Sequence, residues 1–189
     1  IFMVSLVSFA SSIKIGDGAR GGTESIEIGG GARVGTESIM DQKDHGTCTN
    51  SVMDNLRWKV DEGVADRICC FNRRLAEHWG YWQETDFLRS ISNDQCSEGT
   101  ITFYDSVSGL PLFVAPRQRS MEDFIAESTS HGWPSFRDEE VVQKNVRVLP
   151  DGEVVSTSGT HLGHNIPDRT KRNRYCINLV SVAGQPTKN

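Results

Sequence analysis

The second half of the chain consists of short apolar runs separated by turn residues, a pattern typical of antiparallel β-structure. A β-hairpin is predicted where two such runs flank the five-residue segment DSVSG at residues 105–109. A second hairpin is predicted around Pro150-Asp151-Gly152, a strong turn signal. The predicted strands are residues 100–104 (TITFY), 110–115 (LPLFVA), 141–149, 153–156 and 174–182 (RYCINLVSV).

A helical period precedes these strands. Within residues 61–79 apolar side chains recur every three or four positions, which predicts a helix that buries Val64, Ile68, Phe71, Leu75 and Trp79. The charged residues that we expect to face solvent are Arg67, Arg73, Arg74 and Glu77. Cys69 and Cys70 are expected to be buried by packing. A shorter helix is predicted after Ser120, which with Asp123 forms a start similar to a capping box.

Helices followed by clustered strands predict an α+β fold, with mainly antiparallel sheets and N-terminal helices. The 189 residues are enough for one sizeable core. A net charge of −5 without a dense basic run argues against nucleic acid as the main partner. The widest apolar stretch, residues 1–10, is shorter than a membrane span. Five irregularly spaced cysteines do not predict a disulfide framework.

The front of the chain has a different character from the rest. Residues 1–9 (IFMVSLVSF) are similar to the end of a targeting segment, or else form an apolar arm that docks on a partner. Residues 15–27 and 28–40 repeat each other at ten of thirteen positions and are rich in glycine. Glycine at this density disfavours a self-supported helix or strand. We therefore expect three parts: an arm or linker over 1–45, a helical extension over 46–99 and a β domain over 100–189.

Three segments carry residues with chemical potential. They are His131-Gly-Trp-Pro-Ser-Phe136, His161-Leu-Gly-His164 and Arg174-Tyr-Cys-Ile-Asn178. In a strand, residues two apart share a face, so Arg174, Cys176 and Asn178 are expected to project together. A guanidinium beside a thiol favours the nucleophilic thiolate. Two histidines in what is expected to be a turn can supply protons to the same pocket. Each segment alone has an ordinary structural explanation, and it is their combination that indicates a site.

That combination resembles the type B methionine sulfoxide reductases, which reduce methionine-R-sulfoxide. The likeness runs from about residue 100 to residue 183 and rests on the Gly-Trp-Pro-Ser-Phe turn, the His-Leu-Gly-His segment with a following Asp168, and the Arg-Tyr-Cys-x-Asn strand. The resemblance implies the β domain of that family. The chain departs from the family between Asp168 and Arg174, where its sequence is shorter and more basic.

The resemblance also implies roles for individual residues. Cys176 attacks the sulfoxide sulfur and becomes a sulfenic acid, while His161 and His164 help to protonate the oxygen. Trp133 packs against the S-methyl group, and Phe136 and Asp168 belong to the same substrate site. Arg174 lowers the pKa of the thiol, and Asn178 orders the polar network. An external dithiol such as thioredoxin closes the cycle.

Two features of the family are absent from the sequence. Many members bind a structural zinc with two Cys-x-x-Cys pairs, which align here with Asp105, Ser108, Val155 and Ser158. We therefore expect no bound zinc and no other cofactor. The frequent resolving cysteine is replaced by His131, which leaves Cys48, Cys69, Cys70 and Cys96 as candidates. Cys96 is favoured because it lies in a polar segment (SNDQCSEG) that is expected to be free to move.

Two functions from different classes follow. The first is a thiol-dependent methionine-R-sulfoxide reductase that repairs oxidised protein methionine. The alternative is a non-catalytic, reductase-like subunit of a large assembly, such as a plastid photosynthetic one, anchored by residues 1–45. The missing zinc ligands and resolving cysteine favour the second function. The first is favoured by the retained residues Trp133, His161, His164, Arg174, Cys176 and Asn178. A plastid location is favoured because the arrangement resembles algal members of the family.

Overall fold

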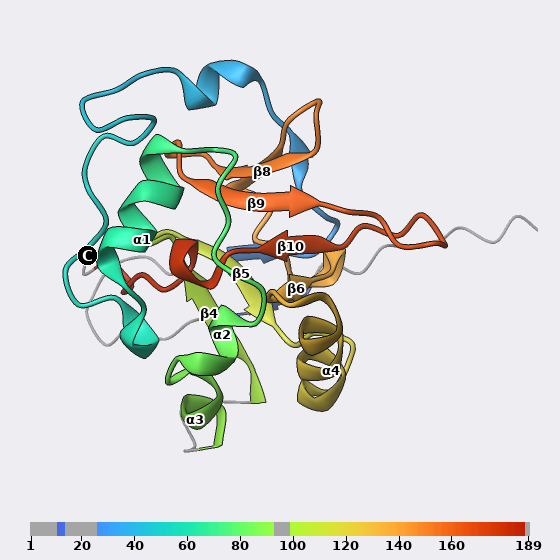
Figure 1. Ribbon diagram of the computed structural model, residues 1–189. Coiled ribbons are helices and arrows are strands. Elements are labelled where there is room, and N and C mark those ends of the chain that lie inside the picture. Colours follow the sequence, from blue (N-terminus) through green and yellow to red (C-terminus); the bar gives the residue numbers. More distant parts are fainter. Residues whose placement is uncertain (1–10, 14–25, 93–98, 188–189) are drawn as a thin grey trace, which may run out of the picture.

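We analysed a computed structural model, which describes residues 11–13, 26–92 and 99–187. Its helices are α1 (Glu62–Asp66), α2 (Tyr81–Glu84), α3 (Phe87–Ser92) and α4 (Met121–His131). Its strands are β1 (Ser11–Ile13), β2 (Ile26–Ile28), β3 (Arg33–Val34), β4 (Ile101–Tyr104), β5 (Pro111–Ala115), β6 (Ser135–Phe136), β7 (Val146–Val148), β8 (Glu153–Ser156), β9 (His161–Asn165) and β10 (Tyr175–Ile177). Figure 1 shows the strands crossing the middle of the molecule, with α1 on one side and α4 below.

The main sheet has six strands in the order β3-β7-β8-β9-β10-β6. All neighbours are antiparallel except β3 and β7, which are parallel. Two further antiparallel pairs are β4-β5 and β1-β2. The expected α+β class with mainly antiparallel sheets is therefore confirmed. Both predicted hairpins are present, although the strand predicted over 141–149 is confined to β7.

The β4-β5 hairpin supplies one wall of an aromatic core. Phe113 of β5 stacks on Phe136 of β6, with ring centroids 4.2 Å apart, and Phe103 meets Phe136 edge-on. Phe124 of α4 closes the cluster at 5.5 Å from Phe136. All four rings are fully buried. Burial of this much aromatic surface holds the hairpin and α4 against the main sheet.

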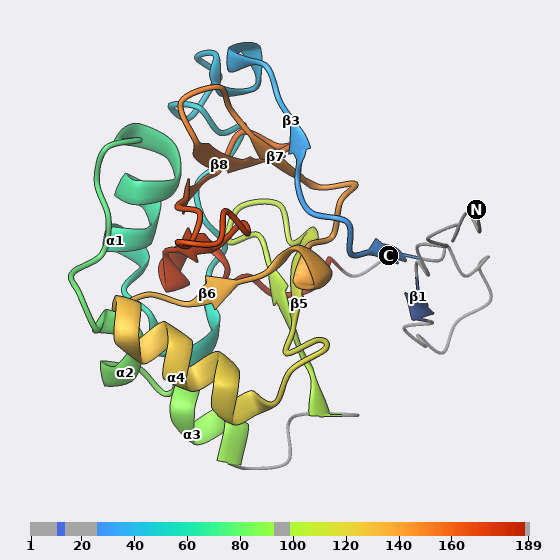
Figure 2. The same ribbon diagram turned by 90° about the vertical axis from the view of Figure 1, so that its right-hand side faces the viewer.

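The predicted start of α4 is confirmed. The Ser120 hydroxyl accepts from the Asp123 N–H, and the Asp123 carboxylate accepts from the Ser120 N–H. At the other end Gly132 adopts a left-handed conformation and ends the helix. Figure 2 shows α4 running alongside β6, with α2 and α3 beneath it. The cap and the glycine therefore fix where the chain turns from α4 into β6.

The predicted helix over 61–79 is only half right. Helix α1 is continued by a π-helical turn, Arg67–Phe71, and the chain leaves the helix at Asn72. A π turn has a longer repeat than an α-helix, so the spacing of three and four no longer selects one face. Ile68 is buried as expected, but Phe71 and Trp79 are 58% and 60% exposed.

Cys48 and Cys70 form a disulfide with their Cα atoms 5.3 Å apart. The disulfide corrects the expectation that Cys70 is buried by packing alone. It could not be predicted, because the sequence gives no sign that the loop before α1 returns to this turn. Cys69, its neighbour, is a buried free thiol as expected. The disulfide ties the segment before α1 to the end of the helical stretch.

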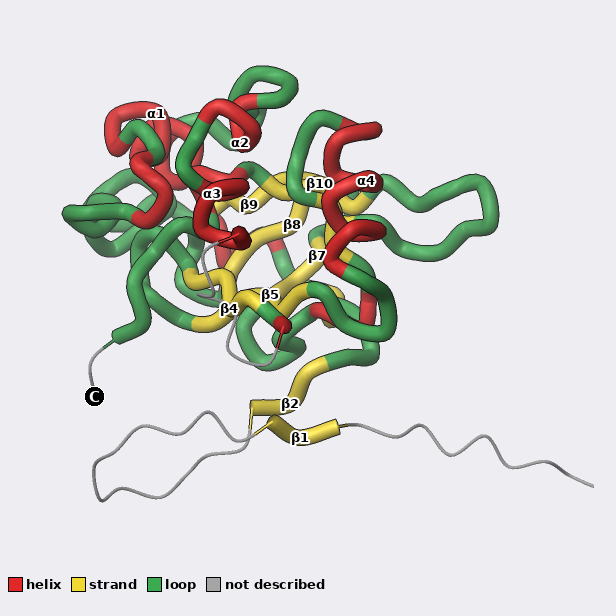
Figure 3. The backbone as a smooth tube through the Cα atoms, turned by 90° about the horizontal axis from the view of Figure 1, so that it is seen from below, coloured by secondary structure: helices red, strands yellow, loops and turns green. Residues whose placement is uncertain are grey.

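Within the predicted arm, the part from Ile28 to Met40 packs against this chain's own β-structure. Strand β3 pairs with β7, Ile28 bridges Val142, and Met40 is buried against Leu149 and Val155. Figure 3 shows the β1-β2 pair standing apart from the remaining strands. None of the helices in the described ranges is both long and apolar enough to cross a lipid bilayer.

Candidate active site

Strand β10 places Cys176 between two neighbouring strands. Cys176 lies opposite Ser135 of β6 and opposite His164 of β9. Directly opposed residues of an antiparallel pair project from the same face, so the thiol and both neighbours share one side of the sheet. Cys176 itself is half-buried.

The surroundings of Cys176 hold the pKa of its thiol above the ordinary value. Burial raises the pKa, and this outweighs the lowering by the positive charge of Arg174 and by a hydrogen bond from Ser135. Arg174 donates through Nη1 to Sγ at 3.8 Å. Arg174 lowers the pKa of the thiol, as expected from the sequence, but burial raises this pKa by more. The resting residue is therefore a neutral thiol that needs a nearby proton acceptor before it can attack.

His161 and His164 belong to β9 and not to a turn as expected. Their ring centroids are nevertheless only 5.7 Å apart, although residues three apart on a regular strand face opposite ways. The explanation is an irregularity in the β8-β9 ladder, where Val154 pairs with Gly163 but Val155 pairs with His161. Such a bulge inserts one extra residue and turns the next side chain to the same face.

The two histidines have different environments. His161 is fully buried, and its Nδ1 lies 2.6 Å from Oε1 of Glu153. His164 is exposed, and burial of part of its ring, together with the charge of His161, lowers its pKa below the ordinary value. His164 is therefore neutral near pH 7 and able to accept a proton, and it is the histidine directly opposite Cys176.

Glu153 links this site to the helical segment. Its carboxylate accepts hydrogen bonds from His161 and from both Nε and Nη2 of Arg73. Arg73 also contacts Glu37 at 2.5 Å. Burial raises the pKa of Glu153, but the bonds from His161 and Arg73 outweigh it, so the net pKa is lowered. Arg73 thus binds a buried carboxylate instead of facing solvent as predicted.

Glu77 is a second residue whose predicted exposure is wrong. It is 3% exposed, and its carboxylate accepts the N–H groups of Leu179 and Val180. Burial raises the pKa of Glu77 to about 7, against the lowering effect of these two donors. The carbonyl of Glu77 accepts from Nε1 of Trp133 at 3.1 Å, while its N–H donates to Oδ1 of Asn178.

Asn178 therefore acts as a cross-link at the end of β10. Its Nδ2 donates to the carbonyl of Leu162, and its Oδ1 accepts from Glu77. The predicted final strand ends here, because Leu179–Ser181 forms a 3-10 turn. Asn178 joins β9, β10 and the Glu77 segment that orients the indole of Trp133.

Two residues that the resemblance placed at the substrate site have other surroundings. Phe136 is part of the fully buried aromatic core, because the core side of β6 faces α4 and the hairpin. Asp168 lies in the loop between β9 and β10, where it accepts from Thr170 and pairs with Arg137 at 3.1 Å. These bonds hold the pKa of Asp168 well below its usual range. The structure thus assigns Asp168 to loop organisation.

The positions that resemble zinc ligands are joined by hydrogen bonds. Asp105 accepts from the hydroxyls of Ser108 and Ser158 at 2.9 and 2.8 Å, and Thr160 also donates to it. Val155 is buried in β8 and takes no part. A single carboxylate with hydroxyl groups lacks the soft donors that structural zinc prefers. The network connects the β4-β5 loop to the β8-β9 loop, as a shared ion at these positions would.

The cysteine favoured for resolving a sulfenic acid, Cys96, lies outside the described residues. Of the other candidates, Cys48 and Cys70 are bonded to each other. Cys69 is fully buried, and burial raises the pKa of its thiol above the ordinary range. Cys69 is therefore poorly suited to react with Cys176.

Sequence reasoning missed Glu77, Arg73, Glu153 and Ser135. Glu153 could have been found, because it directly follows the Pro-Asp-Gly turn and antiparallel pairing brings it opposite His164. Ser135 could have been found from the Gly-Trp-Pro-Ser-Phe segment once β6 was paired with β10. Arg73 and Glu77 carry no such signal, since they follow the unforeseen end of the helix.

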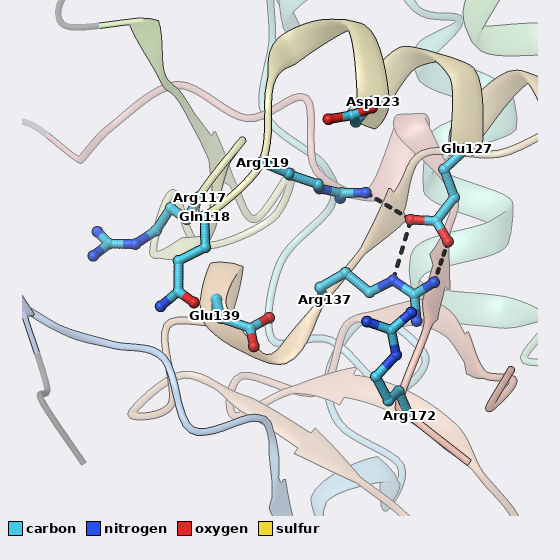
Figure 4. Close-up of a pocket in the computed structure, with 8 residues that line it drawn as sticks. All are labelled: Arg117, Gln118, Arg119, Asp123, Glu127, Arg137, Glu139 and Arg172. Carbon is cyan, nitrogen blue, oxygen red and sulfur yellow. Dashed lines mark hydrogen bonds and ion pairs between the residues drawn. The ribbon is translucent and has the colours of Figure 1, made fainter. Parts of the chain in front are cut away.

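A pocket of about 430 Å³ lies beside this site, between α4 and the loops around β6. Figure 4 shows Arg119 and Arg137 directed toward Glu127 within it. Glu127 also acts on Cys176 by raising the pKa of its thiol. The residues lining the pocket are Arg117, Gln118, Arg119, Asp123, Glu127, Arg137, Glu139 and Arg172. Cys176, Trp133 and the histidines are not among them, so the pocket is a neighbour of the candidate site.

Comparison of the chain with protein-family models, curated proteins and solved structures found no match.

Proposed function

We propose that the chain is a methionine-R-sulfoxide reductase whose nucleophile is Cys176. The observation that carries the proposal is the strand register, which sets Cys176 directly opposite His164, a histidine that is neutral near pH 7. Nucleophilic catalysis by a thiol needs a base that can take its proton, and opposed positions on adjacent strands bring two such side chains close together. The three segments that resemble the type B reductases meet around this pair.

The proposed reaction begins when His164 accepts the proton of Cys176. The thiolate attacks the sulfoxide sulfur, the oxygen is protonated from the histidine pair, and methionine leaves as Cys176 becomes a sulfenic acid. One oxygen passes from the substrate sulfur to the protein sulfur, so atoms balance without another reactant. Trp133, held through its indole N–H by Glu77, supplies an apolar wall for the S-methyl group.

Regeneration needs two electrons from a dithiol. A thioredoxin-like reductant converts the sulfenic acid back to the thiol with release of water, either directly or through a disulfide with Cys96. Oxidised methionine in proteins is the proposed substrate, and a plastid is the proposed location. The proposed reaction does not involve a zinc ion at the Asp105 network.

Turnover of the two sulfoxide epimers tests this proposal. The purified chain should reduce methionine-R-sulfoxide with dithiothreitol and leave the S epimer unchanged, and Cys176→Ser should lose this activity because a hydroxyl is a far weaker nucleophile. Cys69→Ser is the matched control, since Cys69 is a free thiol outside the site. If the wild-type chain forms no methionine with dithiothreitol, the assembly-subunit alternative replaces the enzyme.

A further inference from the structure

We propose that reduction of the Cys48–Cys70 disulfide creates a zinc site formed by both thiolates, His45 and Asp66. This site is separate from Cys176 and from the Asp105 network, and it does not depend on the proposed reductase activity. Its four donor groups come from the loop before α1 and from the helical segment that follows.

The donor atoms are already close together. One donor atom each of His45, Asp66 and Cys70 lie within 4.8 Å of one another. The sulfur of Cys48 is bonded to that of Cys70, so it lies next to this group. Nε2 of His45 is 2.9 Å from each carboxylate oxygen of Asp66. A tetrahedral ion with ligands at about 2.0–2.3 Å fits after a small separation of the two sulfurs.

The local backbone explains this convergence. His45 and Cys48 exchange backbone hydrogen bonds at 3.0 Å, which closes a tight His-x-x-Cys turn. Asp66 and Cys70 are four residues apart on the helical segment, a separation within the range of zinc-ligand spacings. The turn approaches so closely that a Cβ at Gly46 would lie 2.0 Å from the carbonyl oxygen of Cys70. Glycine at this position is therefore required for the contact.

Neighbouring groups orient two of the ligands. The N–H of Val52 donates to Oδ1 of Asp66 at 3.2 Å, and the ring of Phe71 packs edge-on against His45 at 4.6 Å. Such supporting contacts hold metal ligands in position. The side chains of His45 and Asp66 are 30% and 26% exposed, which gives an ion access from solvent.

The chemistry makes the site dependent on redox state. In the disulfide neither sulfur is a thiolate, and a carboxylate only accepts, so Nε2 of His45 carries the proton that faces Asp66. A dithiol reductant supplies two electrons and two protons, which breaks the S–S bond and yields two thiols and an oxidised reductant. Zinc then displaces both thiol protons. It also takes the place of the proton between His45 and Asp66, and that proton moves to Nδ1 of His45. The resulting S₂NO set is one that zinc accepts.

Metal titration of the full chain tests the site. The chain carries Cys176→Ser to remove a half-buried free thiol, and zinc binding is measured by calorimetry before and after reduction with a phosphine. The reduced chain should bind one zinc with release of two thiol protons, and at least about 100-fold more tightly than the oxidised chain. Cobalt in place of zinc should give a sulfur-to-metal charge-transfer band and the visible spectrum of a tetrahedral ion.

Variants and alkylation identify the ligands. His45→Gln and Asp66→Asn should each lower zinc affinity by about 10- to 100-fold or more. His78→Gln, which removes a matched histidine–carboxylate pair with Glu84, should not. Zinc should also protect Cys48 and Cys70, but not Cys96, from alkylation detected by peptide mass.

Three results would overturn the proposal: no zinc binding by the reduced chain, equal binding by the oxidised chain, or full affinity in both ligand variants. If reduction unfolds the chain, recovery of its circular dichroism by zinc supports the site, and failure to recover counts against it.

Discussion

Burial has a larger effect on the acidity of Cys176 than the guanidinium beside it. The thiol lies against Ser135 and Arg174, and its pKa is nevertheless raised. A neutral resting thiol is less prone to adventitious oxidation than a thiolate and reacts only when a base takes its proton. The candidate base is His164, whose lowered pKa keeps it neutral.

The first prediction concerns this acidity. The rate of alkylation of Cys176 by iodoacetamide should rise with pH to a midpoint above that of an ordinary cysteine. Arg174→Met should move the midpoint further up, because it removes the largest of the effects that lower the pKa. Arg174→Lys retains the positive charge and should lie between the two. A wild-type midpoint near neutrality would contradict the assignment of a neutral thiol.

The second prediction concerns Glu153. Glu153→Gln should destabilise the fold by about 1–3 kcal/mol at pH 7, because buried donors lose a charged acceptor. The folded-state pKa of Glu153 is lowered, so its contribution is present above the unfolded value of about 4.3 and disappears as pH falls through the folded value. The variant should therefore lose less stability than the wild type on acidification.

Denaturant unfolding at several pH values measures this difference. Glu37→Gln is the matched control, since Glu37 is the exposed partner of the same Arg73 and should change stability little. Equal effects of the two variants would show that the buried Glu153–His161 contact is not the stabilising one.

At the scale of elements, the bulge in β9 decides what the two histidines can do together. Without it, His161 and His164 would lie on opposite faces of the sheet. The close approach of β9 to β10 is possible because residue 163 is a glycine, where a Cβ would lie 2.1 Å from the carbonyl oxygen of Cys176.

The third prediction follows from that contact. Gly163→Ala should separate the two strands, cost about 1–3 kcal/mol of stability and move His164 away from Cys176. Gly152→Ala is the matched control, because it also has a positive φ but its nearest contact would be 3.5 Å. Denaturant midpoints should fall more for position 163, and only Gly163→Ala should change the rate of alkylation of Cys176 at a given pH. Equal loss at both positions would contradict the packing argument.

The sequence was most informative where one local signal controls an element. The cap at Ser120, the Pro150-Asp151-Gly152 turn and the β4-β5 hairpin were all predicted, because turn and cap residues act within a few positions. The end of the helical segment was not, because the period simply continues through Leu75 and Trp79. Glu77 and Arg73 were misplaced for the same reason, and they connect to the site only through tertiary contacts.

In the candidate site too, local sequence signals were predictive and tertiary contacts were not. Cys176, Arg174 and the two histidines were identified from the sequence, and cross-strand register brings Cys176 and His164 together. The shared face of the histidines could not be predicted, because a bulge has no reliable sequence signal here. Phe136 was assigned to substrate because it belongs to the Gly-Trp-Pro-Ser-Phe segment, whereas its position on the core side of β6 buries it.

At the scale of the whole molecule, three cross-links hold the N-terminal segments in place. The Cys48–Cys70 disulfide joins two of these segments to each other, whereas the Arg73–Glu153 contact and the Glu77 bonds to the turn after β10 join them to the β domain. Two of them end at the candidate site, so the segment before β4 helps to shape it. The extension that lies mostly outside the family resemblance therefore takes part in the architecture of the site.

The fourth prediction concerns the disulfide. Replacing Cys48 and Cys70 together by serine should lower the free energy of unfolding by about 3 kcal/mol, because the bond closes a loop of 22 residues in the unfolded chain. Unfolding of the wild type with and without reductant should show the same difference. A double variant as stable as the oxidised wild type would contradict this contribution of the disulfide to stability.

The most direct test of the central claim is a single turnover without reductant. The wild-type chain, mixed with excess methionine-R-sulfoxide, should release one methionine per chain and gain one oxygen at Cys176, trapped by dimedone and located by peptide mass. Methionine-S-sulfoxide should give neither product. Cys176→Ser should also give neither, whereas Cys69→Ser should behave as the wild type. Absence of methionine release, or a dimedone adduct on a different cysteine, would contradict the assignment of Cys176 as the nucleophile of a methionine-R-sulfoxide reductase.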